Sequence, residues 1–196
     1  RHMLRELLGP EVLRELLDAE VIDGIEARLQ GLDPELRARH ADDVHDLLRR
    51  VGDLDVAGLA ARFEGDDETL REILDRLEET KRIVRLGWPG EPGGPGEPGE
   101  ARGAGEPREE RFVAAEDAAL YRDALGLSLP SGLPAAFLAP AQSPLEQLVL
   151  RHARTHGPFG VDAVARRFGL RPGSLEPLLA SLCARGRLVV GELDPR

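Results

Sequence analysis

An internal repeat at an offset of 105 residues constrains the fold of this chain more than any other feature. Residues 54–63 (LDVAGLAARF) lie over residues 159–168 (FGVDAVARRF), and the match continues without a gap. Leucine and isoleucine then coincide at four helically spaced positions, and Arg82-Ile83-Val84 falls on Arg187-Leu188-Val189. Each copy therefore predicts a short helix ending in Arg-Phe, a turn, a second helix and a β-rich segment.

A preceding helix completes each copy, over residues 42–51 in the first and 145–155 in the second. Three helices followed by a strand are typical of the winged-helix variant of the helix-turn-helix. In the first copy we expect residues 81–88 to pair with residues 111–114 as the wing. In the second, the outgoing strand is predicted at residues 187–193, with a return strand that is missing or very short. Two generic helical hairpins would also fit the apolar pattern, but the strand tails favour winged helices.

The predicted fold class is mainly α with short β-ribbons (α+β), built as tandem winged-helix modules behind an N-terminal helical segment. We expect a cloning remnant at residues 1–3, the helical segment at 4–41, a first winged helix at 42–126, a proline-rich connector at 127–142 and a second winged helix with a shortened wing at 143–196. Apolar spacing predicts one helix over residues 10–31, and Asp33-Pro34 predicts the start of the next. Glu116-Asp117 opens a further helix that ends at Gly126.

A glycine- and proline-rich stretch interrupts the first wing. Thirteen glycines and prolines fall between Gly87 and Pro107, including four G-x-y triplets. Four triplets are too few for a collagen-like triple helix, and the stretch has little apolar surface to bury. We expect residues 89–110 to be a flexible insert at the wing tip, where a loop tolerates additions.

Composition excludes several classes of function. Apolar residues are 41% and charged residues 32%, as in a soluble globular protein, and no apolar run is long enough to span a membrane. Aromatic residues are only 4%, which argues against a stacking platform for single-stranded nucleic acid. The single cysteine, Cys183, excludes a disulfide framework and fits the cytoplasm. The net charge is −10, so contact with nucleic acid requires a local basic patch.

The two copies differ in charge. The third helix of the first copy, residues 66–79, carries seven acids against two arginines and should be repelled by phosphates. Residues 143–196 hold eight arginines and five acids. The candidate DNA contacts are the arginines that flank the turn or enter the wing of the second copy: Arg166, Arg167, Arg171, Arg185 and Arg187. The third helix there has almost no base-reading side chain, so we expect sequence-independent backbone contacts or, alternatively, a solvated or protein-facing surface.

The sequence has no pattern typical of a reactive centre. Phosphate-binding loops and the G-x-S-x-G elbow are absent. His152 and His156 lie four residues apart but lack the glutamate of a zinc-protease helix, and Cys183 has no histidine nearby in the sequence. Paired carboxylates lie at predicted helix starts, where capping explains them. We therefore expect no catalytic residue, metal or cofactor in this segment.

Several runs resemble one family of proteins. They are residues 112–126, 129–140, 148–159 and 164–170, together with 42–50 upstream. These runs resemble the bacterial Lhr (large helicase-related) proteins, which are ATP-dependent DNA helicases, and the ARTHGPF run at residues 153–159 is fairly specific.

The resemblance implies a segment from the region that follows the helicase motor. ATP and magnesium would bind in that motor, which translocates on single-stranded DNA, and no helicase residue carries over to this segment. The Gln-x-Gln signature of the related winged-helix glycosylases is absent, since Gln142 and Gln147 are five apart. The implied role is a scaffold and DNA-guiding surface in a cytoplasmic, nucleoid-associated repair helicase, with the rest of the parent chain as partner and a homo-tetramer expected. A pure protein-interaction module and a winged-helix transcription regulator are the alternatives.

Overall fold

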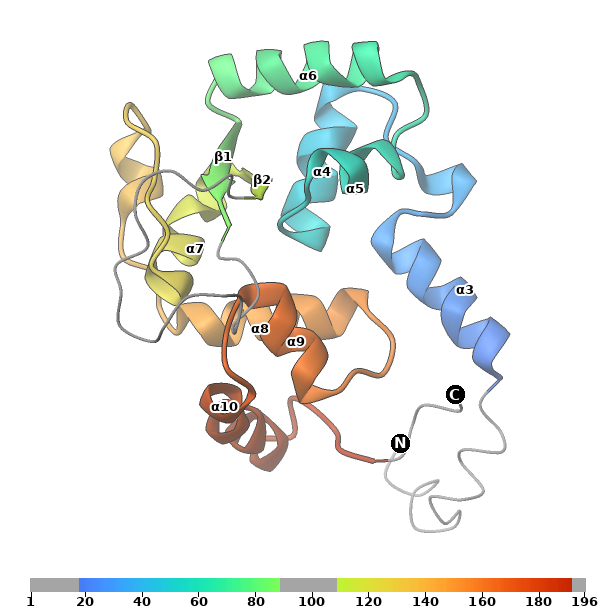
Figure 1. Ribbon diagram of the computed structural model, residues 1–196, viewed down its shortest axis with the longest axis vertical. Helices are drawn as coiled ribbons and strands as arrows, with labels where there is room; N and C mark the ends of the chain where they lie inside the picture. The colour runs from blue at the N-terminus through green and yellow to red at the C-terminus, as the bar shows by residue number, and fades with distance from the viewer. Residues whose placement is uncertain (1–17, 89–108, 192–196) are drawn as a thin grey trace.

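A β-hairpin lies between two groups of helices in the computed structural model, which describes residues 18–88 and 109–191 (Figure 1). The hairpin strands are β1 (Ile83–Gly87) and β2 (Glu110–Ala114). The helices are α3 (Ala19–Gln30), α4 (Ala41–Val51), α5 (Val56–Ala60), α6 (Asp67–Glu79), α7 (Ala118–Leu125), α8 (Pro144–Thr155), α9 (Val161–Phe168) and α10 (Pro172–Ala184). Among the described residues the fold is thus mostly helical with one short antiparallel sheet, which confirms the predicted mainly α class with a β-ribbon after the first unit.

The first helical unit consists of α4, α5 and α6. Carboxylates cap its helices: Asp55 accepts a hydrogen bond from the Gly58 N–H at 2.6 Å, and Asp66 accepts one from the Thr69 N–H at 2.7 Å. An acid at these positions satisfies N–H groups that the helix leaves unpaired. The inward residues of α4 are buried as predicted: Val44, Leu47, Leu48 and Val51.

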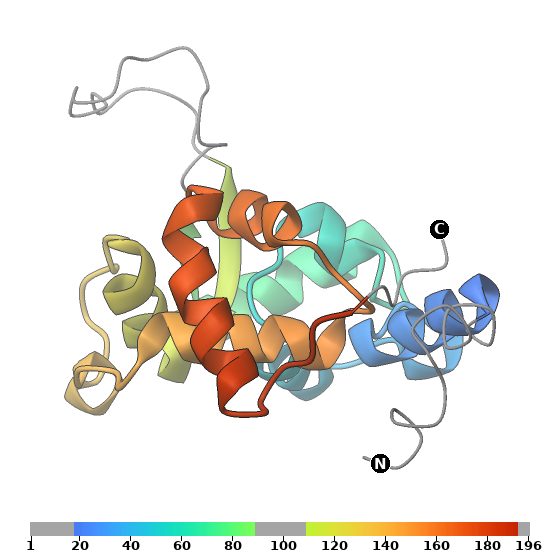
Figure 2. The ribbon, with the colours of Figure 1, turned by 90° about the horizontal axis from the view of Figure 1, so that it is seen from below.

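The hairpin is buried on both faces. Its register pairs Ile83 with Ala114, Val84 with Val113 and Leu86 with Arg111, so side chains alternate between the two faces. One face adds Ile83, Phe112 and Ala114 to the core of the first helical unit. The other face adds Val84, Leu86, Trp88 and Val113 to a second core with α7, α8, α9 and α10. Figure 2, seen from below, shows α9 and α10 in front of the hairpin and α6 behind it.

The second helical unit repeats the helix order of the first. Helices α8, α9 and α10 follow one another as α4, α5 and α6 do. The predicted strand over residues 187–193 is wrong where the structure describes it, because residues 187–191 adopt no regular structure. A strand needs a hydrogen-bonded neighbour, and this unit offers none within the described ranges.

The N-terminal helices depart from prediction at their starts. Helix α3 begins at Ala19 because Asp18 is extended and caps it, accepting from the Glu20 N–H at 2.8 Å. It ends as predicted at Gly31, whose φ of 72° is left-handed. Asp33 caps only the 3-10 turn η1 (Pro34–Leu36), because Ala38 then pairs its backbone with the chain around Phe63. Residues 10–17 and the glycine-rich insert at 89–108 lie outside the described residues.

The link between the two units contains α7 and two short 3-10 turns. The 3-10 turn η2 (Ala115–Asp117) leads from β2 into α7, which ends at Gly126 as predicted. The connector at 127–142 contains the 3-10 turn η3 (Ala135–Leu138) and buries Leu127 and Leu133. In the part of the chain that the structure describes, no helix has the length and apolarity needed to cross a membrane.

Candidate nucleic-acid interface

Two of the five candidate arginines lie at the turn between α9 and α10. Gly169, at a φ of 64°, ends α9 and turns the chain toward α10. Arg166 is in the last turn of α9 and Arg171 is the N-cap residue of α10, and both side chains are exposed. Exposed guanidinium groups at a helix start can reach a phosphate backbone without reading bases.

Two other candidates lie beyond the opposite end of α10. Arg185 pairs with Glu146 of α8 at 2.7 Å. The hydrogen bond that Arg185 donates is the main reason why the pKa of Glu146 is lowered. Arg187 lines a shallow hollow beside Glu146, together with Arg151 and Arg154 of α8. The structure therefore places four of the five predicted arginines in two groups, at opposite ends of α10.

Arg167 belongs to neither group. Its side chain is only 19% exposed, and its Nη2 lies 3.3 Å from Oδ1 and 3.1 Å from the backbone oxygen of Asp53. Its own carbonyl accepts a 2.9 Å hydrogen bond from Nε1 of Trp88. These contacts engage Arg167 inside the protein, so we leave it out of the DNA-contact set.

Asp53 is the centre of a buried polar junction between the two helical units. Its side chain is 2% exposed and pairs with Arg111 of β2 at 2.7 Å as well as with Arg167 of α9. Its backbone N–H donates to the Tyr121 hydroxyl at 2.9 Å, and burial raises the pKa of Tyr121. Gly52 precedes it at a φ of 97°, and a Cβ there would lie 2.8 Å from the Tyr121 oxygen.

Sequence reasoning missed Asp53, although the repeat held a signal for it. Arg167 falls on Arg62 in the first copy, and Arg62 is buried too. Arg62 donates from Nε to the Gln30 carbonyl at 2.8 Å and from Nη2 to Gln30 Oε1 at 2.6 Å, which fixes α3 against the first unit. The same repeat position is therefore arginine in both copies, although the first copy is acidic and would repel phosphates. This favours a structural role for the position over a phosphate contact.

The two third helices present different surfaces. The exposed face of α6 is rich in carboxylates, while its leucines point inward. The exposed positions of α10 are small or uncharged apart from one acid: Pro172, Gly173, Ser174, Glu176, Pro177, Ala180, Ser181 and Ala184. Neither face carries the row of donors that reads bases in the major groove.

His152, which is buried, and His156, which is half-buried, form a stacked pair at the end of α8. Their rings stack at 3.7 Å, and the edge of Phe159 lies 4.8 Å from the His152 ring. Both ring nitrogens of His152 lack a hydrogen-bond partner among the described residues, and burial lowers the pKa of His152 to about 3. No group of three or more metal-ligating side chains occurs in the described ranges. Burial therefore favours the neutral form of His152 in the folded chain.

This burial predicts a loss of stability in acid. The folded pKa of about 3 lies below the unfolded value, so below about pH 6.5 the unfolded chain binds more protons than the folded chain. We expect the free energy of unfolding to fall by about 1–2 kcal/mol between pH 7 and pH 5, measured by urea denaturation. In His152→Leu the free energy of unfolding should fall less between pH 7 and pH 5. An unchanged pH dependence in that variant would show that His152 is not the group responsible.

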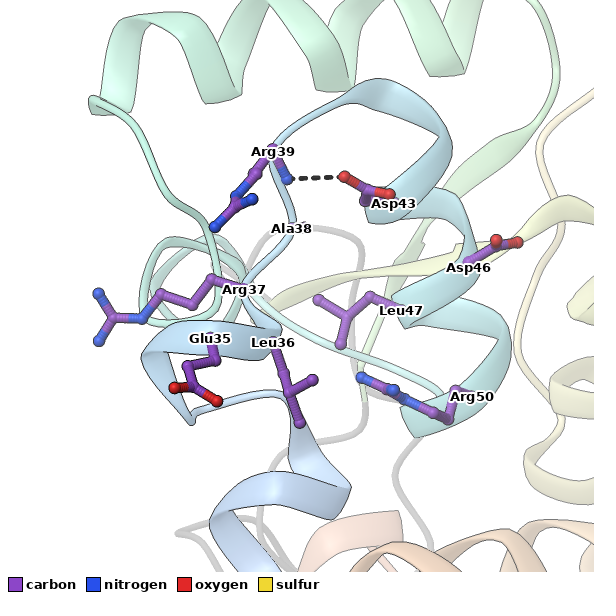
Figure 3. Close-up of a pocket in the computed structure, with 9 residues that line it drawn as sticks. All are labelled: Glu35, Leu36, Arg37, Ala38, Arg39, Asp43, Asp46, Leu47 and Arg50. Atoms are coloured by element: carbon purple, nitrogen blue, oxygen red, sulfur yellow. Dashed lines mark hydrogen bonds between the residues drawn. The ribbon is translucent and has the colours of Figure 1, made fainter.

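A second hollow lies between η1 and α4 (Figure 3). It measures about 380 Å³, and Figure 3 shows Leu36, Leu47 and Arg50 pointing toward one another while Arg37 points away. Asp43 accepts hydrogen bonds from the N–H groups of Arg39 and His40, at 2.9 and 3.1 Å. Three acids and three arginines line it, so its charge selects neither anions nor cations.

Comparison with known proteins gives matches over most of the chain. A family model described as "Large helicase-related protein, winged-helix domain" matches residues 15–140. The "Lhr helicase/ probable uracil glycosylase" of Mycolicibacterium smegmatis is 38% identical over 190 residues, 97% of this chain. The "Lhr helicase/uracil glycosylase" of Escherichia coli is 35% identical over 184 residues, 94% of this chain. The chain spans 11% of the length of each of these relatives.

Proposed function

The chain belongs to the large helicase-related (Lhr) proteins, and from this premise we propose that it is a non-catalytic accessory module of an ATP-dependent DNA repair helicase. Its role is to hold two helical units in a fixed relation and to guide DNA past the second. The longer protein would bind ATP and magnesium in its motor, assemble as a homo-oligomer, with a tetramer expected, and act in the cytoplasm at the nucleoid.

The burial of the hairpin on both faces carries this proposal. A winged helix that contacts DNA uses its third helix and its wing. In the first unit both faces of the hairpin are covered by apolar cores, and α6 exposes carboxylates that phosphates would repel. Neither the wing nor the third helix of this unit is therefore suited to DNA, and we assign the first unit a structural role. We assign the second unit, α8–α10, as a second winged helix, because its helices follow the order and the sequence of the first.

Sequence-independent DNA contact is assigned to exposed arginines of the second unit. Arg166 and Arg171 flank the turn before α10, and Arg185 and Arg187 lie at and beyond its end. Each phosphate contact releases condensed counterions, so such binding weakens steeply with salt. Helix α10 exposes no arginine, lysine, asparagine or glutamine side chain, which supports backbone contact over base recognition.

Removing both turn arginines provides the test. In Arg166→Ala/Arg171→Ala we expect the slope of log affinity against log salt to decrease by about 2, equally for unrelated DNA sequences. Fluorescence anisotropy with labelled DNA at several salt concentrations measures this slope. The matched control is Arg71→Ala/Arg76→Ala on acidic α6, which should leave the slope unchanged.

The same titration decides between this proposal and its main alternative, an assembly module without DNA contact. The alternative is favoured by an apolar stripe on α3, where Val21, Ile25 and Leu29 are 56%, 54% and 40% exposed. If the chain shows no salt-dependent DNA binding, the assembly role stands alone. A sequence-selective footprint would instead support a transcription regulator, and ATP turnover by the chain would contradict a non-catalytic role.

A further inference from the structure

Arginine side chains surround the shallow hollow between the start of α8 and the chain that follows α10. The hollow measures about 350 Å³, and its lining includes Arg151 and Arg154 of α8 together with Arg187. Among the described residues that line it, Glu146 is the one acid. The hollow therefore carries an excess of positive charge, in a chain whose net charge is −10.

Two of these three arginines are available to a ligand. Arg151 pairs with Asp117 at 2.8 Å and is thereby engaged in the fold. Arg154 and Arg187 are exposed, and neither forms an ion pair with an acid in the described stretches of the chain. Arg154 donates from Nε to the Leu150 carbonyl at 3.0 Å, which holds its side chain along α8 and leaves its Nη groups for a ligand.

The acid in the hollow is already neutralised. Glu146 pairs with Arg185 at 2.7 Å. Arg185 thus offsets the carboxylate that would otherwise repel an anion from the hollow. Arg154 and Arg187 therefore supply two positive charges that no acid in the lining compensates.

The first unit shows the same position with its charge neutralised. The ungapped repeat places Arg187 on Arg82, and Arg82 forms an ion pair with Asp42 in the first turn of α4. In the second unit the acid in the first turn of α8, Glu146, pairs with Arg185 instead. An arginine that only held the end of the unit against its first helix would be paired as Arg82 is. The unpaired state of Arg187 therefore favours a role in binding.

We propose that this hollow is a phosphate pocket, in which Arg154 and Arg187 together bind one phosphate group, supplied by a phosphodiester of the DNA backbone. Guanidinium groups bind phosphate oxygens through paired N–H donors. Ser143, the N-cap residue of α8, borders the hollow and makes no side-chain capping hydrogen bond, so its hydroxyl can donate to the same group. Arg185 acts on this pocket through Glu146. The DNA source of the phosphate rests on the proposed function, whereas the pocket itself does not.

Two arginines on one phosphate predict a specific salt dependence. In Arg154→Ala/Arg187→Ala the slope of log affinity against log salt, measured by fluorescence anisotropy with labelled DNA, should decrease by about 1, because one phosphate contact is lost. The control Arg71→Ala/Arg76→Ala on α6 should leave the slope unchanged. A decrease of about 2 would show that each arginine meets its own phosphate on an open surface. That result, or an unchanged slope in the double variant, would overturn the proposal.

Glu146→Gln tests the pocket in the opposite direction. The substitution removes the carboxylate beside the phosphate and frees Arg185, so affinity for DNA should rise about three- to ten-fold at low salt. An unchanged or weaker affinity would contradict the proposal.

Inorganic phosphate separates the pocket from its DNA source. When phosphate replaces chloride at constant ionic strength, the side-chain Nε–H resonances of Arg154 and Arg187 should shift in heteronuclear NMR spectra, while those of Arg71 should not. If Arg154 and Arg187 do not shift, the pocket is overturned. If they shift but the double variant binds DNA like the parent, the assignment of the phosphate to DNA is overturned. This readout needs no DNA, so the test of the turn arginines can fail without affecting it.

Discussion

Replacing Asp53 with alanine is expected to lower the free energy of unfolding by about 3–5 kcal/mol. The substitution leaves Arg111 and Arg167, 18% and 19% exposed, without their shared carboxylate. Removing one partner of a buried ion pair is costly because the remaining charges stay desolvated. Urea denaturation followed by circular dichroism at 222 nm measures the change.

Glu109→Ala is the matched control for this prediction. Glu109 also pairs with Arg111, at 2.9 Å, but it is 50% exposed. Exposed ion pairs contribute little, so we expect a change within about 0.5 kcal/mol. If Asp53→Ala proved as mild as Glu109→Ala, the polar junction would not hold the units together.

Trp88→Ala is expected to cost a similar amount, about 3–5 kcal/mol. Trp88 is 2% exposed, lies edge-on to Tyr121 at 5.8 Å and carries the Arg111 guanidinium 4.5 Å above its ring. Its removal opens a cavity between the hairpin and the second unit and leaves the Arg167 carbonyl without its indole donor. Denaturation followed by far-ultraviolet circular dichroism measures this loss.

Trp88→Phe separates packing from hydrogen bonding. Phenylalanine keeps most of the apolar volume but cannot donate to Arg167, so we expect a smaller loss of about 1–2 kcal/mol. A full loss in both variants would assign the effect to the hydrogen bond, and a small loss in both would show that the interface is loosely packed.

The repeat predicted the parts of this fold that depend on local pattern. Periodic apolar residues placed α4, α6 and α8, and acids marked the starts of α4 and α6. The β-rich tail after α6 placed β1 opposite β2. These signals act over a few residues. The start of the N-terminal helix was wrong because Asp18 can cap a helix as well as lie within one. The helix predicted from Asp33 was interrupted because Ala38 pairs with the distant Phe63, which local spacing does not show.

The candidate site shows the same difference between features set by local sequence and features set by distant residues. The exposure of Arg166 and Arg171 follows from their place at the turn between α9 and α10. The engagement of Arg167 depends on Asp53, which is 114 residues away in sequence, and no local pattern joins the two. The strand predicted at residues 187–193 failed over its described part for a related reason, since a β-rich composition forms a strand only beside a partner.

Amide hydrogen exchange of the hairpin tests the central claim, that β1 and β2 form a buried support between two helical units. We expect the amides of Val84, Leu86 and Val113 to exchange only through global unfolding, as slowly as the most protected amides of α4 and α8. Exchange at the rate of exposed loops, while α4 and α8 remain protected, would show a free wing and contradict the account.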